Sequence, residues 1–215
     1  AGIAYEVYSE VVPNPTCKNV HDGLERLKGT DCDFLVSIGG GSPQDTAKAI
    51  GILATNGGHI KEYEGVNLSK NKSLPIVAVN TTAGTSSEVT INYVVTDEER
   101  HVKMVMVDKN SLATVTVNDP ELMVEKPASL TAATGMDALT HAIETIVTPG
   151  AYPVSDATAL AAVKIIFDYL PRAVENGHDI EAREQMVYAV FLGGIAFSNA
   201  CLLYTSPSPR DRTRS

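Results

Sequence analysis

The sequence predicts a two-part fold, an α/β portion followed by an all-helical portion. Short, largely apolar runs at residues 34–38 and 74–79 are typical of parallel strands that are covered on both faces. After about Pro127 the strand signal stops, and only helical periodicity continues. Since 44% of the 215 residues are hydrophobic, the chain can build one large or two modest domains. We predict an α/β domain at 1–126, a helical domain at 127–203 and a separate tail at 204–215.

Composition narrows the classes of partner. A formal net charge of −9 argues against a nucleic-acid surface, and no apolar run reaches the ~18 residues of a membrane span. The three cysteines, Cys17, Cys32 and Cys201, are odd in number and lack C-x-x-C spacing. We therefore expect free thiols, a reducing compartment and a cytoplasmic location.

The first elements predict a right-handed βαβ unit. Residues 3–8 alternate like a strand, residues 20–27 have helical spacing, and residues 34–38 form the next strand. The chain lacks an initiating methionine and its first strand has nothing before it, so we expect that sequence upstream is missing.

Three consecutive glycines, Gly39 to Gly41, separate this strand from a helix. Ser42 is a suitable N-cap, Pro43 fits the first helical position, and the Asp45 carboxylate can return to the cap, so we expect the helix to begin at Ser42 or Pro43. Bare backbone at a helix N-terminus suits a phosphate or pyrophosphate. The stretch matches neither G-x-G-x-x-G nor a P-loop, and the alternative is a tight turn that binds nothing.

A second turn, residues 80–88, is rich in Ser and Thr and follows the predicted strand at 74–79. Small hydroxyl residues at the carboxyl end of a parallel strand can donate to phosphate or ribose oxygens. The alternative is a loop that hydrogen-bonds only to itself. Residues 61–73 are predicted as loop, 89–95 and 102–107 as an antiparallel hairpin, and 115–117 as a last short strand.

The helix predicted at 130–148 carries Asp137 and His141 one turn apart. Their side chains can close on one point, which permits a shared Fe²⁺ or Zn²⁺ ion. A solvated polar stripe is the alternative, and it is the commoner meaning of such a pair. A metal needs three or four ligands, and only Glu144 or a remote histidine such as His178, expected on the surface, could be added. Further helices are predicted at 155–175, ending near Pro171, and at 180–200, where Gly193 and Gly194 allow close packing.

Three motifs in this order, SIGGGSPQDTAKAIG, VNTTAGTSSEVT and LTAATGMDALTHAIE, resemble the iron-activated (group III) alcohol dehydrogenases. The resemblance covers about residues 5–200 and is strongest to the branch of lactaldehyde reductase, 1,3-propanediol dehydrogenase and butanol dehydrogenase.

The resemblance implies the dehydroquinate synthase-like fold of these enzymes, with a dinucleotide-binding α/β domain, a helical domain and an active site between them. It implies NAD or NADP as cofactor, Fe²⁺ or alternatively Zn²⁺ as metal, and a short-chain alcohol, diol or aldehyde as substrate. It also implies that the metal would polarise the alcohol oxygen while hydride passes to the nicotinamide. A homodimer or larger homo-oligomer is expected. The positions that match the cofactor contacts of the family are Asn14, Gly40, Gly41, Ser42, Thr81, Thr82, Thr85, Asn92 and Lys103, and those that match its first two metal ligands are Asp137 and His141.

Departures from the family pattern predict an incomplete protein. The family supplies two more metal-binding histidines after a stretch corresponding to residues 197–200, where this chain continues as Leu203-Tyr204-Thr205-Ser206-Pro207. The first strand of the family fold and its phosphate turn would lie upstream of Ala1. We expect an internal fragment, inactive on its own, with a foreign tail. The alternatives are a catalytically dead nucleotide-binding remnant and a non-redox relative similar to dehydroquinate synthase.

Overall fold

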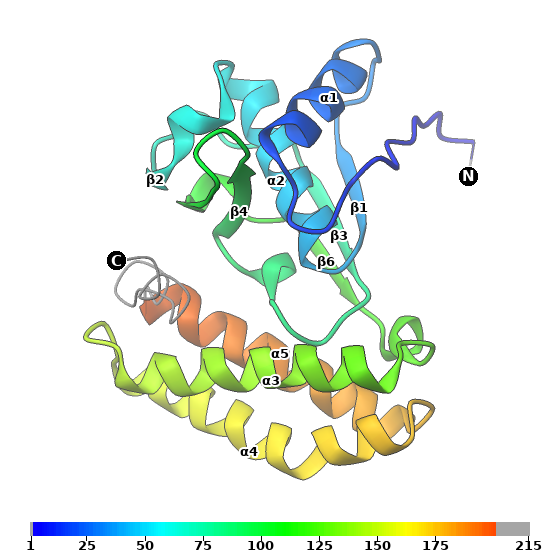
Figure 1. The fold of residues 1–215 in the computed structure, drawn as a ribbon, viewed down its shortest axis with the longest axis vertical. Helices are drawn as coiled ribbons and strands as arrows, with labels where there is room; N and C mark the ends of the chain where they lie inside the picture. The colour runs from blue at the N-terminus through cyan, green and yellow to red at the C-terminus, as the bar shows by residue number, and fades with distance from the viewer. Residues whose placement is uncertain (1, 201–215) are drawn as a thin grey trace. The chain divides into compact units, whose positions relative to one another are not determined.

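The structure is a computed structural model that describes residues 2–200. It divides into two units, which Figure 1 shows as ribbons. The sheet unit holds the residues up to Asn80 together with Ile91–Val117, and the helical unit holds Thr81–Thr90 together with the residues from Asn118 onward. This order of an α/β portion before a helical portion confirms the predicted fold class. The domain boundary at 126/127 stays a prediction, and the tail predicted at 204–215 and Cys201 lie outside the described residues.

One sheet of the sheet unit has the strand order β1-β3-β6, where β1 is Leu35–Gly39, β3 is Ile76–Asn80 and β6 is Val115–Asn118. Strands β1 and β3 are parallel, with Leu35 opposite Ile76 and Gly39 opposite Asn80. Helix α2 (Gly41–Asn56) packs against both strands. The carboxyl ends of β1 and β3 therefore meet at one edge of the sheet, where the two predicted turns begin.

The expectation that both faces of β1 are covered is wrong for the part of the chain that the structure describes. Ser37 is buried, whereas Val36 and Ile38 on the alternate face are 54% and 67% exposed. Val115 and Val117 of β6 are exposed as well. An apolar run predicts cover on both faces, but within residues 2–200 only one face of this strand is buried.

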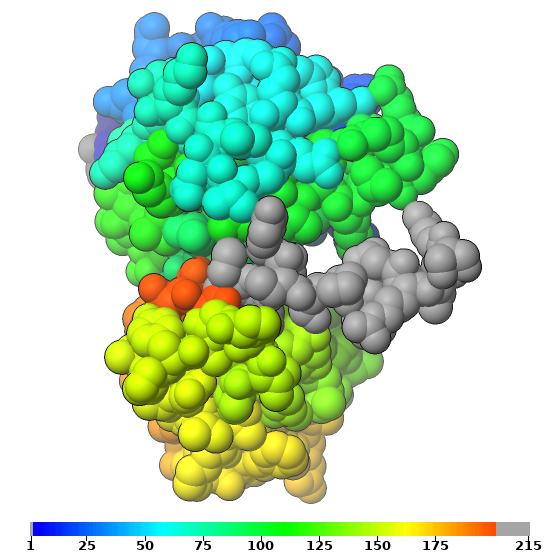
Figure 2. Space-filling model, turned by 90° about the vertical axis from the view of Figure 1, so that its left-hand side faces the viewer, coloured from blue at the N-terminus to red at the C-terminus, as the bar shows by residue number. Residues whose placement is uncertain are grey.

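The second sheet has the order β2-β5-β4, with β2 at Gly65–Val66, β5 at Val102–Val107 and β4 at Asn92–Asp97. Strands β4 and β5 are antiparallel, which confirms the predicted hairpin, whereas β2 falls in a segment predicted as loop. The segment that carries β2 and the short helix η1 (Ile60–Tyr63), coloured cyan, forms part of the surface of this unit in Figure 2. Short helices also occur at η2 (Ser87–Val89) and η3 (Lys109–Ser111).

Helix α1 (Cys17–Lys28) confirms the predicted helix, and Thr16 and Asn19 form a capping box at its start. The strand predicted at 3–8 is absent from the described residues, and so is the βαβ unit built on it. Ile3, Tyr5 and Val7 are 65%, 80% and 59% exposed. Alternation alone does not make a strand, because a strand needs a hydrogen-bonded neighbour.

Helix α2 begins at Gly41 with Gly40 as its N-cap, so the predicted start at Ser42 or Pro43 is wrong. The Ser42 hydroxyl oxygen accepts a hydrogen bond from the Asn14 amide at 3.3 Å. The Asp45 carboxylate accepts one from the Val94 amide at 3.1 Å. Both predicted capping groups bind other segments of the sheet unit.

In the helical unit, α3 (Ala128–Val147), α4 (Pro153–Glu175) and α5 (Ile180–Ala200) lie side by side after the short helix η4 (Pro120–Met123) (Figure 1). Helix α4 continues through Pro171, where its end was expected. Proline removes one helical hydrogen bond, but Leu170 and Ala173 on either side are buried in the core of this unit, which holds the last turn in place. Among the described helices, none combines the length and apolarity that a membrane crossing needs.

Candidate functional site

The glycine bend between β1 and α2 requires glycine at its first position. Gly39 has a φ of +147°, and a Cβ there would lie 2.7 Å from Cγ of Pro43. The N-cap Gly40 makes no side-chain cap hydrogen bond. Because the first amides of a helix have no intrahelical acceptor, the N–H groups of Gly41 and Ser42 are suited to an anion.

A groove of about 270 Å³ lies at this bend, lined by Val11–Pro13 and by Gly40, Gly41, Ser42 and Pro43. Asn14 follows the groove wall in a left-handed conformation with a φ of +55° and is tied to Ser42 by its amide. The structure thus brings together four of the predicted cofactor positions, Asn14, Gly40, Gly41 and Ser42. Val11 to Pro13 belong to none of the three motifs, and the sequence marks them only by the X-Pro pairs Val12-Pro13 and Asn14-Pro15, which favour an extended backbone.

Asn92 and Lys103 lie on the β4–β5 hairpin. Lys103 is exposed and lies opposite Thr96 in the pairing of β4 with β5. The Thr96 hydroxyl donates to the Asn14 carbonyl oxygen at 3.4 Å. Asn92 lies four residues before Thr96 on β4, is 7% exposed, and its side-chain oxygen Oδ1 has no hydrogen-bond partner among residues 2–200. Lys103 is therefore linked to the bend through Thr96, whereas Asn92 offers a buried acceptor at the other end of the strand.

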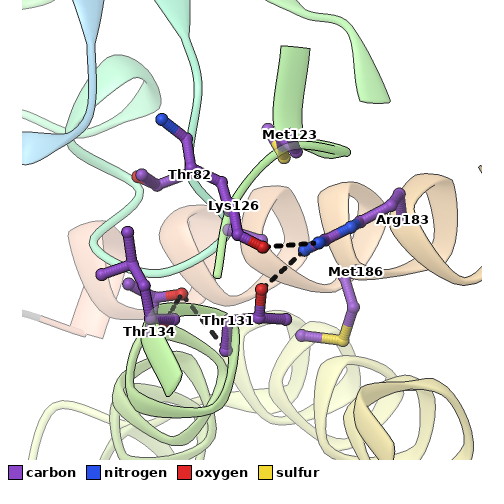
Figure 3. A pocket seen from close by; sticks show the side chains of 9 residues that line it. Thr82, Met123, Lys126, Thr131, Thr134, Arg183 and Met186 are labelled. Carbon is purple, nitrogen blue, oxygen red and sulfur yellow. Dashed lines mark hydrogen bonds between the residues drawn. The ribbon is translucent and has the colours of Figure 1, made fainter. Parts of the chain in front are cut away.

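The predicted hydroxyl positions Thr81, Thr82 and Thr85 lie on the segment Thr81–Thr90 of the helical unit. The Thr85 hydroxyl oxygen accepts from the Ser87 amide at 3.3 Å, so part of this turn does hydrogen-bond to itself. Thr82 lines a water-sized cavity of about 10 Å³ with Thr131, Thr134 and Arg183 (Figure 3).

Arg183 is a buried residue at this cavity that none of the sequence motifs indicated. Its guanidinium donates to the Gly177 carbonyl and the Thr131 hydroxyl, both at 2.9 Å, and burial lowers the pKa of this group. The sequence feature that indicates burial of Arg183 is its position beside the apolar residues Ala182 and Met186. Its contacts hold the first turn of α3.

Asp137 and His141 lie on α3, with Oδ1 of Asp137 3.9 Å from Nε2 of His141. The His141 side chain is 19% exposed and the Asp137 side chain 45%. The centroid of the His141 ring lies 4.9 Å from the centroid of the Phe197 ring. Nδ1 of His141 is buried without a hydrogen-bond partner in the described part of the chain. The imidazole is held in place by packing while one nitrogen faces the carboxylate.

A carboxylate oxygen and an imidazole nitrogen at this separation fit two positions of a divalent metal site. Residues 2–200 contain no group of three or more His, Cys, Asp or Glu side chains that could hold a metal ion. Neither Glu144 nor His178 therefore completes the set, and His178 is exposed as expected.

Comparison with known proteins agrees with the three motifs. Residues 1–120 match the family Iron-containing alcohol dehydrogenase, and residues 131–205 match Fe-containing alcohol dehydrogenase family, C-terminal. The NAD-dependent methanol dehydrogenase of Bacillus methanolicus is 54% identical over 94% of this chain and 53% of the relative. The 1,3-propanediol dehydrogenase of Klebsiella pneumoniae is 50% identical over 95% of this chain and 53% of the relative.

A solved structure, the alcohol dehydrogenase from Oenococcus oeni, has a TM-score of 0.91 at 44% identity, covering 94% of this chain and 52% of that one. The chain spans about half the length of the curated relatives it matches. The family matches and the shared fold together show that this chain belongs to the iron-containing alcohol dehydrogenase family.

Proposed function

We propose that this chain binds NAD(H) at the glycine bend and that the full-length protein interconverts short-chain alcohols or diols with aldehydes. The observation that carries the proposal is the groove at the N-terminus of α2, where glycine backbone and uncapped amides face open space. We assign the pyrophosphate to the amides of Gly41 and Ser42, because the positive end of the helix dipole favours an anion there.

We assign to the remaining predicted cofactor positions the role of orienting the bound nucleotide. The hydroxyl groups of Thr81, Thr82 and Thr85 are small donors that suit ribose and phosphate oxygens, and the buried Oδ1 of Asn92 is an acceptor for an amide or hydroxyl donor. The relative from Bacillus methanolicus is named as NAD-dependent, which favours NAD over NADP here.

We propose that Asp137 and His141 hold a divalent metal, Fe²⁺ or Zn²⁺, in the full-length protein. When bound, such an ion supplies Lewis-acid polarisation of the alcohol or aldehyde oxygen, and the nicotinamide supplies the hydride transfer. The two side chains contribute one oxygen and one nitrogen donor, and the packing of His141 against Phe197 orients the ring.

A second candidate, a nucleotide-binding chain without turnover, is favoured for the 215-residue chain itself. Only two metal-ligand side chains come together within residues 2–200, and two ligands do not hold such an ion firmly. Redox activity is therefore proposed for the longer protein, and dinucleotide binding for this chain.

Titration of the 215-residue chain with NADH, followed by NADH fluorescence, tests the binding proposal. Ser42→Glu places a negative charge beside the pyrophosphate position and is expected to weaken NADH binding at least ~10-fold. Ala54→Glu adds the same charge at an exposed position at the far end of α2 and is expected to bind like the wild type. Equal affinity in both variants would overturn the assignment of the bend.

An assay with NADH, an aldehyde and added Fe²⁺ or Zn²⁺ tests the reaction proposed for the full-length protein. We expect no turnover by the 215-residue chain, and turnover once a family-like C-terminal segment with two further histidines is joined to it. Failure of the extended protein to oxidise NADH with any short-chain aldehyde would contradict the proposed reaction.

A further inference from the structure

The hydroxyl-rich turn Thr81–Thr90 packs against two helices of its own unit at two contacts that leave no space for a Cβ atom. We call these two contacts the seats of the turn. The turn meets α3 at Gly84 and α5 at Gly194. Neither glycine has a positive φ. Glycine is therefore needed at these positions because a Cβ has no space, and not because of the backbone conformation.

The first seat is at Gly84, which is buried against α3. A Cβ on Gly84 would lie 2.8 Å from Cβ and 3.1 Å from the carbonyl oxygen of Thr134. The carbonyl belongs to helix backbone and cannot move aside as the end of a flexible side chain would. Figure 3 shows Thr82 and Thr134 on facing sides of the small cavity next to this contact.

The second seat is at Gly194 on α5. A Cβ there would lie 2.6 Å from Cβ of Ser86 and 2.8 Å from Cγ2 of Val89. The Ser86 hydroxyl donates to the Val190 carbonyl oxygen of the same helix at 2.8 Å, and Ser86 is 3% exposed.

Ser86 also carries backbone strain. Its φ of +57° is left-handed, a conformation that costs a non-glycine residue of this kind about 1 kcal/mol or more. Such strain persists only where the surroundings fix the backbone, and here the hydrogen bond to α5 and the close contact at Gly194 do so.

We infer that Gly84 and Gly194 are positioning residues for the nucleotide: they let α3 and α5 set the place of Thr81, Thr82 and Thr85. The inference rests on the proposed function of this turn. Thr134 lies three residues before Asp137 on α3, so the helix that bears the proposed metal ligands also carries a seat of the cofactor turn.

The test uses NADH titration of the 215-residue chain and of Gly84→Ala and Gly194→Ala, with both dissociation constant and binding stoichiometry measured. Displacing the turn is expected to raise the dissociation constant at least ~10-fold at unchanged stoichiometry. Gly193→Ala is the matched control, because among residues 2–200 a Cβ there meets only Cβ of Ala162, at 3.9 Å, and it is expected to bind like the wild type.

A rescue variant separates positioning from general damage. Ser86→Gly together with Val89→Ala removes both atoms that the Gly194→Ala methyl meets most closely, Cβ of Ser86 and Cγ2 of Val89, and the new glycine relieves the left-handed strain. The triple variant Ser86→Gly/Val89→Ala/Gly194→Ala is therefore expected to bind NADH within ~3-fold of Ser86→Gly/Val89→Ala.

The outcomes are distinct. If the wild-type chain does not bind NADH, the proposed function fails. If it binds but the two alanine variants lose stoichiometry at an unchanged dissociation constant, or bind like Gly193→Ala, the positioning inference is overturned while the proposed function stands.

Discussion

The ammonium group of Lys48 lies 2.7 Å from the carbonyl oxygen of Asn92, and both residues are buried. Lys48 is 1% exposed on α2, and Asn92 opens strand β4. A buried lysine is tolerated only when its charge is compensated by polar groups, and this bond joins the helix after the glycine bend to the hairpin that carries Asn92.

Lys48→Met is expected to lower the free energy of unfolding by roughly 1–3 kcal/mol, because it leaves the Asn92 carbonyl oxygen without this donor. Lys72→Met, at an exposed lysine, is expected to change it by less than about 0.5 kcal/mol. Urea unfolding of both variants measures the difference. A Lys48→Met chain as stable as Lys72→Met would show that the bond contributes nothing.

Tyr93→Phe is expected to leave stability unchanged or raise it by up to about 1 kcal/mol. The Tyr93 ring is 1% exposed, its hydroxyl has no hydrogen-bond partner among the described residues, and burial raises the pKa of this group. Removing an unsatisfied buried hydroxyl removes its desolvation cost.

The matched variant is Tyr63→Phe. The Tyr63 hydroxyl donates to the Gly57 carbonyl oxygen at 2.9 Å, so its loss is expected to cost roughly 0.5–1.5 kcal/mol. Thermal unfolding of the pair checks the order. Tyr93→Phe being the less stable of the two would mean that its hydroxyl is satisfied.

The stability of the sheet unit is expected to fall in mild acid because of His21. Burial first, and then the nearby His59 and Lys28, lower the pKa of His21 below its ordinary value of 6.5. The two rings lie 4.3 Å apart between centroids, and Nε2 of His21 accepts from the Ile60 amide at 3.4 Å. Between the lowered folded pKa and 6.5 the unfolded chain binds more protons, so this contribution is complete above about pH 6.5 and is lost as the pH falls.

Unfolding free energies at pH 8 and pH 5.5 measure this effect. His21→Gln keeps an acceptor for Ile60 but does not titrate, so it is expected to lose less stability over this range than the wild type. Equal losses in the two proteins would rule out the protonation of His21 as a cause.

His141→Ala is expected to weaken Zn²⁺ binding by the 215-residue chain at least ~10-fold, because it leaves Asp137 as a single donor. NADH affinity is expected to stay within ~2-fold of the wild type. His178→Ala, at an exposed histidine in the turn between α4 and α5, is the control. Isothermal titration with Zn²⁺ measures the loss, and unchanged affinity in His141→Ala would refute the metal assignment.

Local signals predicted much of this fold. The spacing of Val20 and Leu24 predicted α1, the alternation on both sides of residues 96–101 predicted the β4–β5 hairpin, and the period around Leu139 predicted α3. Each signal lies within one element, so no knowledge of distant contacts was needed.

The errors arose where a distant contact decides the outcome. Ser42 is a good N-cap by type, but its hydroxyl oxygen binds Asn14, 28 residues earlier in the chain. Residues 3–8 alternate like a strand but lack a neighbouring strand within the described residues. In the candidate site, residue types indicated the glycine bend and the Asp137–His141 pair, whereas the seats of the turn at Gly84 and Gly194 depend on packing between segments far apart in sequence.

The chain leaves the sheet unit after Asn80, contributes Thr81–Thr90 to the helical unit, and returns at Ile91 before it leaves again after Val117. No single cut in the gene can therefore separate the two units. A recombinant piece that starts at Asn118 would lack the peptide that fills the space beside Thr134 and Gly194. Chimaeras between members of the family would have to exchange this short internal stretch together with the helices, and not with the strands that flank it in the sequence.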